Sequence, residues 1–388
     1  MVHNYYQQKA GEDLSFEAES KLLKDHGHKV IKYTKHNNQI KNMNSIDLFR
    51  KMVWNKKTYN DLCRIIQKEK PDIVHFQNTF PLISPSAYYA AKAEGIPIIQ
   101  SLRNYRLFCP AATFSRNGQI CEKCSKKSFF WSIIHGCYHN SRIKTGALTT
   151  MLVIHHFMKT WQKKVDVYIA NTKFSKKKFI QGGLSAKKIF IKPNFVDSDP
   201  EIQKNKGNYA LFIGRLSPEK GIFTMLRAWK SLKNIPLKII GTGPIKRDVE
   251  KFIQQNKLKN IELVGYCPKE KVFSYIKKSR FLIFPSEWYE TFGRTIIEAF
   301  ACSIPIIISR LGAMKEIVKD NYTGLNFEPG NAKDLVEKIK WAWTHKKDMQ
   351  RMGENARKDY EEKYTPKKNY KQLMKIYQFA INNENSNI

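Results

Sequence analysis

Short apolar runs that alternate with helix-length segments are the feature of this sequence that most constrains its fold. The runs are four to seven residues long and are closed by Gly, Pro or Asn. Such runs are typical of parallel strands that are buried on both faces. The sequence predicts strands at residues 1–4, 29–34, 73–77, 96–102, 165–171 and 189–193 in the first half, and at 209–215, 237–241, 261–265, 281–286, 305–309 and 325–328 in the second.

The alternation predicts an α/β fold in which a doubly wound, Rossmann-like parallel sheet occurs twice. We expect an N-terminal domain over residues 1–198 with a Cys-rich insertion at about 104–142, a linker over 199–207 and a C-terminal domain over 208–364. Thr365-Pro366 is a good start for a final helix, 365–388, which we expect to pack back on the N-terminal domain. Two such domains predict a ligand site in a cleft between them.

Composition limits the class of partner. The 388 residues carry 68 basic and 34 acidic side chains, a net charge of +34, which favours a polyanionic partner: nucleic acid, an anionic bilayer or a phosphorylated substrate. Nucleic acid is disfavoured because no helix-turn-helix, two-histidine zinc finger or RNA-binding aromatic signature is present. With no apolar run of eighteen residues and no secretory signal, we expect a cytoplasmic protein, with peripheral attachment to the membrane as an open alternative.

Two acidic residues suggest a ligand site in the second half. Residues 281–299 form a predicted strand, turn and helix, with Glu290 in the turn and Glu298 in the helix. A carboxylate there can accept two hydrogen bonds from a ribose diol. The amides of Phe292, Gly293 and Arg294 open the helix and can donate to a phosphate or a sugar hydroxyl. The alternative is that Glu290 only complements the helix dipole and Glu298 is a solvated surface residue.

Two cations strengthen this interpretation. Arg215 ends a predicted strand, and Lys220 stands at the start of the next predicted helix. Fixed positive charges at the end of a sheet suit a diphosphate and would stabilise it as a leaving group, in place of a metal ion. The alternative is two surface cations.

In combination these motifs resemble the family-4 retaining glycosyltransferases of the GT-B fold, also called glycosyl transferases group 1. The resemblance rests on Gly214-Arg215-Leu216 with Glu219-Lys220-Gly221, on the Glu290 and Glu298 pair, and on the stretch from Ser309 to Glu316. It extends to the loop around Gly11 and to residues 74–81 and 104–110, so it covers essentially the whole chain.

The resemblance implies sugar transfer from a nucleotide-sugar donor with retention, without a metal cofactor for catalysis. It places Arg215 and Lys220 on the diphosphate, Glu298 on the ribose and Glu290 near the reacting carbon. The amides of 292–294 would contact sugar and phosphate, and the Gly11 loop would close over the donor. The implied acceptor is a glycan, in particular one linked to polyprenyl diphosphate, in the synthesis of a bacterial surface polysaccharide such as capsule or lipopolysaccharide.

Arg103 departs from the family pattern, in which a His is common at this position. Arginine cannot act as a base because its pKa exceeds ~12. The expected catalytic role of Arg103 is therefore to stabilise negative charge on the leaving phosphate. The alternative is a protein that binds a nucleotide sugar without turnover. Asp13 and His75 are further polar groups on the acceptor side, and a structural role is favoured for both.

The remaining features concern the insertion and the segment after it. Cys109, Cys121, Cys124 and Cys137 have a spacing compatible with a structural zinc site, in which His135 or His139 could replace a ligand; the alternative is reduced thiols in a loop. Residues 142–164 predict a helix with an apolar cluster and basic ends. Such a helix can lie on an anionic membrane, or its apolar stripe can pack on the first sheet.

Overall fold

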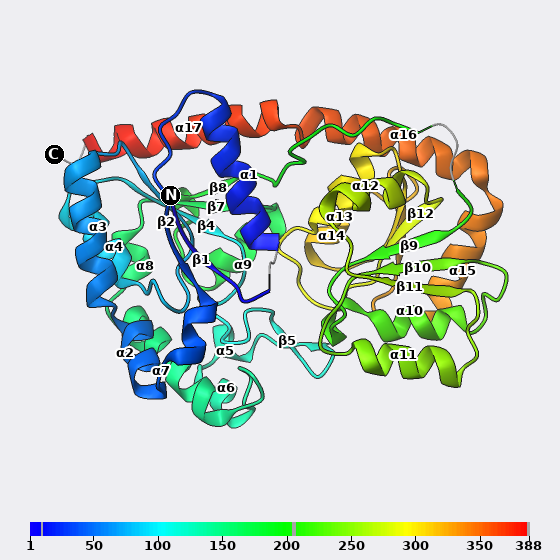
Figure 1. Cartoon of the computed structure of the whole chain (residues 1–388), viewed down its shortest axis with the longest axis horizontal. Coiled ribbons are helices and arrows are strands. Elements are labelled where there is room, and N and C mark those ends of the chain that lie inside the picture. The colour runs from blue at the N-terminus through cyan, green and yellow to red at the C-terminus, as the bar shows by residue number, and fades with distance from the viewer. Residues whose placement is uncertain (9–10, 204–206, 386–388) are drawn as a thin grey trace. The chain divides into compact units, whose positions relative to one another are not determined.

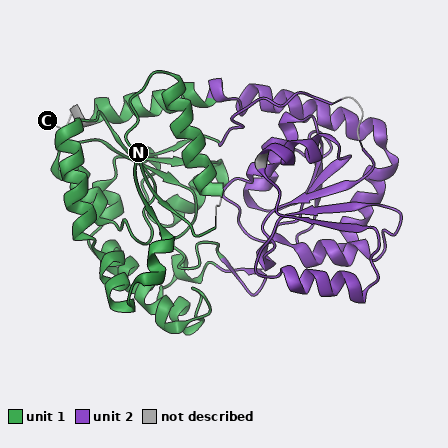
Figure 2. Cartoon of the chain, in the orientation of Figure 1, with its two compact units in different colours: residues 1–114, 122–193, 369–388 green, residues 115–121, 194–368 purple. Residues whose placement is uncertain are grey.

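The chain divides into two compact units, each built around its own parallel sheet (Figures 1 and 2). The computed structural model describes residues 1–8, 11–203 and 207–385. Unit 1 comprises Met1–Phe114, Glu122–Pro193 and the C-terminal segment from Asn369, and unit 2 comprises Ser115–Cys121 and Asn194–Lys368.

Unit 1 contains a six-stranded sheet in the order β2-β1-β3-β4-β7-β8, with every pairing parallel. The order changes direction at the neighbours β1 and β3, which are therefore the topological switch point. The strands are β1 (Val2–Tyr5), β2 (Tyr33–His36), β3 (Val74–Asn78), β4 (Ile98–Leu102), β7 (Val167–Ala170) and β8 (Ile189–Ile191). The helices are α1 (Gly11–Asp25), α2 (Ser45–Val53), α3 (Lys56–Glu69), α4 (Ser86–Ala93), α5 (Lys123–Lys126), α6 (Phe130–Ile134), α7 (Arg142–Phe157), α8 (Thr160–Lys164) and α9 (Lys173–Gln181), with short 3-10 turns at Asn37–Asn42 and Ala186–Lys188.

Unit 2 contains the second parallel sheet, in the order β11-β10-β9-β12-β13-β14, with its switch point between β9 and β12. Its strands are β9 (Ala210–Ile213), β10 (Leu237–Ile240), β11 (Ile261–Gly265), β12 (Phe281–Phe284), β13 (Ile306–Ser309) and β14 (Gly324–Phe327). Its helices are α10 (Ile222–Trp229), α11 (Lys246–Gln255), α12 (Lys269–Lys277), α13 (Arg294–Ala301), α14 (Gly312–Ile317), α15 (Ala332–Thr344) and α16 (Lys346–Lys363), with a 3-10 turn at Pro218–Lys220.

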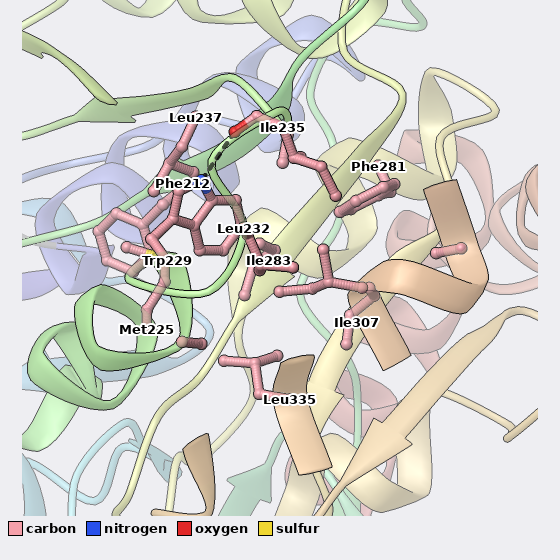
Figure 3. Packing of buried hydrophobic residues seen from close by; sticks show 14 of the residues in the cluster. Phe212, Met225, Trp229, Leu232, Ile235, Leu237, Phe281, Ile283, Ile307 and Leu335 are labelled. Atoms are coloured by element: carbon pink, nitrogen blue, oxygen red, sulfur yellow. Dashed lines mark hydrogen bonds between the residues drawn. The ribbon is translucent and has the colours of Figure 1, made fainter. Parts of the chain in front are cut away.

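Buried side chains on one face of the second sheet form a continuous core (Figure 3). Trp229 on α10 lies fully buried in this core, and its indole Nε1 donates a hydrogen bond to the Ile235 carbonyl at 2.9 Å. The hydrogen bond satisfies the one polar atom of the side chain, so that the large ring can be buried without an unpaired donor.

The final helix α17 (Pro366–Asn385) packs on the first sheet. Its residues Leu373, Ile376 and Ala380 are buried in one cluster with Ile99 of β4 and Val167 of β7. Buried apolar contacts thus fix the C-terminal segment to unit 1, although the chain between them passes through unit 2.

Two elements differ from the sequence prediction. The second strand was expected at 29–34 and forms at Tyr33–His36, where its pairing with β1 begins. The helix expected over 142–164 is interrupted at Lys159, whose φ of 53° is left-handed, so that α7 and α8 are separate. Among the described residues, no helix is both long and apolar enough to cross a membrane.

Candidate functional site

The sequence-predicted cations and carboxylates of unit 2 follow the two strands of its switch point. Arg215 follows the end of β9, and Glu290 lies in the loop after β12. Because β9 and β12 are parallel neighbours, the loops after their carboxyl ends emerge at the same edge of the sheet. Topology therefore brings together residues that are about seventy positions apart in the sequence.

Lys220 and Glu290 form the central contact of this edge. The Lys220 Nζ lies 2.5 Å from Glu290 Oε1, and the same oxygen accepts hydrogen bonds from Ser286 Oγ and Trp288 Nε1, both at 2.9 Å. The ammonium also lies over the rings of Phe284 and Trp288. Glu290 is buried and Lys220 is partly exposed, so the carboxylate is fixed while the cation still reaches solvent.

Arg215 lies at the more exposed end of the same site. Its Nη2 donates to Glu219 Oε1 at 2.7 Å, while 61% of its side chain surface is exposed. Burial would raise the pKa of Glu219, but hydrogen bonds from Ser217 and Arg215 lower it, so the carboxylate stays ionised. Arg215 therefore presents a fixed positive charge to solvent.

A close backbone approach holds the two loops together. Gly221 has a φ of +68°, and a Cβ there would lie 1.9 Å from the Pro285 carbonyl oxygen. Only glycine permits both the left-handed conformation and this approach. The Glu287 amide also donates to the Glu219 carbonyl at 2.9 Å. The loop that carries Lys220 is thereby fixed against the loop that carries Glu290.

The third part of the site is the start of α13. Gly293 caps the helix with a φ of +92°, and the buried Phe292 ring packs edge-on against Tyr364. Arg294 is the first residue of the helix; its Nε donates to Glu298 Oε1, one turn further on, at 3.1 Å, and its Nη2 contacts Asp197. Glu298 is therefore a paired, largely buried carboxylate rather than a solvated surface residue.

Arg103 lies in a buried polar network of unit 1. Its Nε, Nη1 and Nη2 donate to Gln77 Oε1, Asn171 Oδ1 and Glu19 Oε1 at 3.0, 3.1 and 3.0 Å. Glu19 Oε1 also accepts from the fully buried Lys192 Nζ at 2.6 Å. Three nitrogens of the guanidinium thus bind protein groups, which is the arrangement of a structural arginine.

The same network sets the protonation states of its members. Burial would raise the pKa of Glu19, but Lys192 and Arg103 hold it well below its usual range. Burial lowers the pKa of His75 to about 3, against the opposing effect of Glu19. His75 is therefore neutral near pH 7, and it contacts Ser101 Oγ and the Tyr377 hydroxyl of α17 at 2.9 and 2.8 Å.

The structure also places the other residues named from the sequence. Gly11 is the first residue of α1, and a Cβ there would meet no atom within 4 Å. Asp13 is buried and lies 2.8 Å from His3 Nε2. The four insertion cysteines are not joined in disulfides, and within the described ranges no three His, Cys, Asp or Glu side chains are grouped to hold a metal ion. The geometry thus gives the zinc prediction no support.

Sequence reasoning missed four residues that shape these networks: Ser286 and Trp288 on Glu290, and Glu19 and Lys192 around Arg103. Ser286 and Trp288 could have been found, since both lie in the motif that contains Glu290. Lys192 comes directly after β8, much as Arg215 comes shortly after β9, and this position was the available signal. Glu19 lies inside an amphipathic helix, and nothing in the sequence distinguishes it from a surface acid.

Most of unit 2 matches a known protein family. Residues 196–359 match the family model described as glycosyl transferases group 1. An uncharacterized glycosyltransferase of Methanocaldococcus jannaschii is 36% identical over 180 residues, which is 46% of this chain and 50% of that protein. The O-antigen chain mannosyltransferase C of Escherichia coli is 29% identical over 160 residues, or 41% and 43% of the two chains. The alignments thus span about half the length of these curated relatives.

Solved structures extend the likeness to the whole fold. A glycosyltransferase from Rickettsia africae superposes with a TM-score of 0.68 at 18% identity and 98% coverage of both chains. The Anabaena protein HepE, solved in complex with UDP and glucose, gives a TM-score of 0.67 at 14% identity, with 96% and 98% of the two chains covered. Residues 196–359 thus match the glycosyl transferases group 1 family, and the chain as a whole has the GT-B fold.

Proposed function

We propose that this chain is a retaining glycosyltransferase that transfers a sugar from a nucleotide-sugar donor to a glycan acceptor carried on a lipid diphosphate. The observation that carries the proposal is the meeting of Lys220, Arg215, Glu290 and the start of α13 at the switch point of unit 2. This is where doubly wound sheets bind nucleotides. The polysaccharide-related relatives favour a surface polysaccharide as the product.

In this proposal each donor residue has a distinct task. Lys220 and Arg215 hold the diphosphate by charge-assisted hydrogen bonds, together with the first amides of α13. Glu298, oriented by Arg294, accepts the ribose hydroxyls. Glu290, which Lys220, Ser286 and Trp288 fix in place, lies near the sugar carbon that reacts.

The proposed reaction needs no side chain that acts as a base. The bond between the anomeric carbon and the phosphate oxygen breaks, and its electron pair leaves with the nucleoside diphosphate. The acceptor hydroxyl attacks on the same face of the sugar and gives its proton to the departing phosphate. Lys220 and Arg215 stabilise the charge that develops on that phosphate, which is the largest contribution a preorganised site can make. Arg103 is proposed only to position its neighbours, because Glu19, Gln77 and Asn171 occupy its nitrogens.

Replacing Glu298 tests the donor assignment. We expect Glu298→Gln to abolish the release of nucleoside diphosphate from a panel of nucleotide sugars, while its thermal unfolding stays close to that of the parent. Glu250→Gln is the matched control, because Glu250 also forms an i,i+4 pair with a cation on a helix of unit 2, at 3.6 Å from Lys246. A Glu298→Gln rate equal to that of the parent would refute the assignment.

We also propose that unit 1 binds an anionic membrane through α7. Of the predicted apolar cluster, Leu148, Met151 and Leu152 are buried. Ile143, Val153 and Phe157 are 86%, 50% and 88% exposed. Their spacing places the three exposed residues on one side of the helix. One face of α7 is therefore buried, in contact with α2, α6 and α8, while the other face is apolar and exposed.

The surroundings of α7 favour a bilayer as the occupant of this face. The neighbouring α2 and α6 pack on α7 and expose Ile46 and Phe130, at 65% and 61%. Exposed Arg142, Lys144 and Lys159 stand at its ends. Apolar residues that insert and cations that attract phospholipid headgroups are the two requirements of an interfacial helix.

Vesicle sedimentation tests this contact. We expect the parent to bind vesicles of phosphatidylglycerol and not of phosphatidylcholine, and Phe157→Ser to weaken binding about tenfold, since burying a Phe side chain contributes about 1.5–3 kcal/mol. Phe379→Ser, on α17 of the same unit and 40% exposed, is the control. Equal loss in both variants, or none, would contradict the assignment.

A further inference from the structure

A pocket in unit 1 lies next to the buried polar network of Arg103. Its walls come from the segments that follow β3 and β4 and from α7 and α8. These carboxyl ends lie next to the switch point of the first sheet, where ligands of such folds bind. The lining includes Asn78, Phe80, Arg103, Asn104, Arg106 and Trp161.

Two arginines, Arg103 and Arg106, line the pocket. Arg106 is the one with a guanidinium nitrogen that has no hydrogen-bond partner. Its Cζ atom lies 4.3 Å from the Phe80 ring centroid and 5.5 Å from that of Tyr138. Its Nη1 donates to the Pro110 carbonyl at 2.9 Å, whereas Nε is buried without a hydrogen-bond partner. No carboxylate in the described part of the chain forms an ion pair with it. Nε therefore lacks an acceptor, and no described residue accepts a hydrogen bond from Nη2.

This arrangement contrasts with that of Arg103. Arg103 lines the same pocket but directs three nitrogens at Gln77, Asn171 and Glu19. A buried N–H group without a partner costs free energy, and native proteins keep such a group where a ligand or water satisfies it. The two arginines therefore have different roles, and only Arg106 has the donor edge that a ligand would need.

A half-buried acid, Glu12, lies next to Asn104 at the edge of the pocket. Asn104, which lines the pocket, donates to Glu12 Oε1 at 2.8 Å, whereas Glu12 Oε2 is buried without a partner. Burial raises the pKa of Glu12, and Asn104 and Arg106 oppose the shift. A hydroxyl next to a bound anion would thus find an acceptor as well.

We propose that the Nε and Nη2 edge of Arg106 binds an oxyanion of the acceptor substrate, as a bidentate pair. The planar fork of arginine matches two oxygens of a phosphate or of a carboxylate. The oxyanion comes either from the diphosphate of a lipid-linked acceptor or from the carboxylate of an acidic sugar. The inference rests on the proposed function, because it names the chemical class of that enzyme's acceptor.

Binding without turnover tests the proposal in the full chain. The double variant Arg215→Ala with Lys220→Ala serves as the background, so that phosphate binding in unit 2 does not contribute. Farnesyl diphosphate and D-glucuronate are titrated by calorimetry into this background, alone and combined with Arg106→Gln or Arg106→Lys. Arg64→Gln is the control, because Arg64 is a 78% exposed arginine of the same unit.

We expect at least one of the two probes to bind the background, and Arg106→Gln to weaken that binding at least tenfold, with Arg64→Gln unchanged. Arg106→Lys keeps the charge and the packing between the two rings but loses the fork, so it should also bind more weakly while its circular dichroism stays native. Binding of farnesyl diphosphate alone assigns the oxyanion to the lipid diphosphate, and binding of glucuronate alone to an acidic sugar. The proposal is overturned if neither probe binds the background, or if both Arg106 variants bind as tightly as the background does.

The proposed glycosyltransferase function can be refuted independently of the Arg106 assignment. It fails if the parent releases no nucleoside diphosphate from any nucleotide sugar, a result that the titrations do not depend on. A chain that binds the oxyanion through Arg106 but transfers no sugar would keep the pocket assignment and remove the enzymatic one.

Discussion

Replacing Arg103 by Gln separates a structural role from a catalytic one. The substitution removes hydrogen bonds of 3.0–3.1 Å to Gln77, Asn171 and Glu19, all made by a side chain that is 3% exposed. It also removes one of the two cations that contact the buried Glu19 carboxylate. The expected main effect is therefore on the stability of unit 1.

The size of the expected loss of stability depends on the charge that remains next to Glu19. Breaking a buried ion pair costs about 3–5 kcal/mol when a charge is left alone. Lys192 stays 2.6 Å from Glu19, so we expect the lower end, about 3 kcal/mol. For a unit of about 200 residues, each kcal/mol shifts the melting temperature by roughly 2–4 °C, which predicts a fall of about 6–12 °C.

Thermal unfolding followed by circular dichroism measures this fall. Arg64→Gln, in the same unit, should change the free energy of unfolding by no more than about 0.5 kcal/mol because the side chain is exposed. A melting temperature of Arg103→Gln within about 2 °C of the parent, combined with loss of turnover, would refute the structural role and assign Arg103 to the chemistry.

Three further predictions concern stability. Gly221→Ala should lower the urea midpoint of unit 2 by the equivalent of about 1–3 kcal/mol, because its Cβ would clash with the Pro285 carbonyl. The folded-state pKa of His75, about 3, lies below the unfolded value of 6.5, so the unfolded state binds more protons between these values. Unfolding at a series of pH values should show stability lost as pH falls from 6.5 towards 3, with a smaller loss in His75→Asn. Trp229→Phe should lower the free energy of unfolding by about 1–2 kcal/mol, because the indole hydrogen bond and part of a fully buried ring are lost, while Asn260 Nδ2 still donates to the Ile235 carbonyl; no change in the urea midpoint would contradict this.

The regular part of the fold could be predicted because it depends on local patterns. Each expected parallel strand of both sheets forms, since a buried apolar run closed by a turn residue leaves few alternatives. The helix starts also follow local chemistry: the Asn331 side chain accepts from the amides of Lys333 and Asp334. The Asn117-Gly118 turn forms a hairpin between β5 (Ser115–Arg116) and β6 (Gln119–Ile120), with positive φ at both residues.

The candidate site could be predicted only in part because its contacts are not local. The residue types at the ends of β9 and β12 indicated a diphosphate site, but the 2.5 Å contact of Lys220 with Glu290 follows from which strands are neighbours. Arg103 was expected at a phosphate because of its position in a motif. Its actual partners come from α1 and from the ends of β3 and β7, which no spacing in the sequence reveals.

The most direct test of the account is the affinity of the full chain for a nucleoside diphosphate, measured by calorimetry with UDP and GDP. Lys220→Ala should weaken binding about 10- to 100-fold, because a hydrogen bond to a charged group contributes about 1.5–3 kcal/mol. Lys238→Ala is the matched control: Lys238 of β10 also pairs with a glutamate at 2.5 Å, but within the strand rather than after its carboxyl end. The account predicts loss in the first variant and unchanged affinity in the second. Equal affinity of Lys220→Ala and the parent would contradict the assignment of a donor site to the switch point of unit 2.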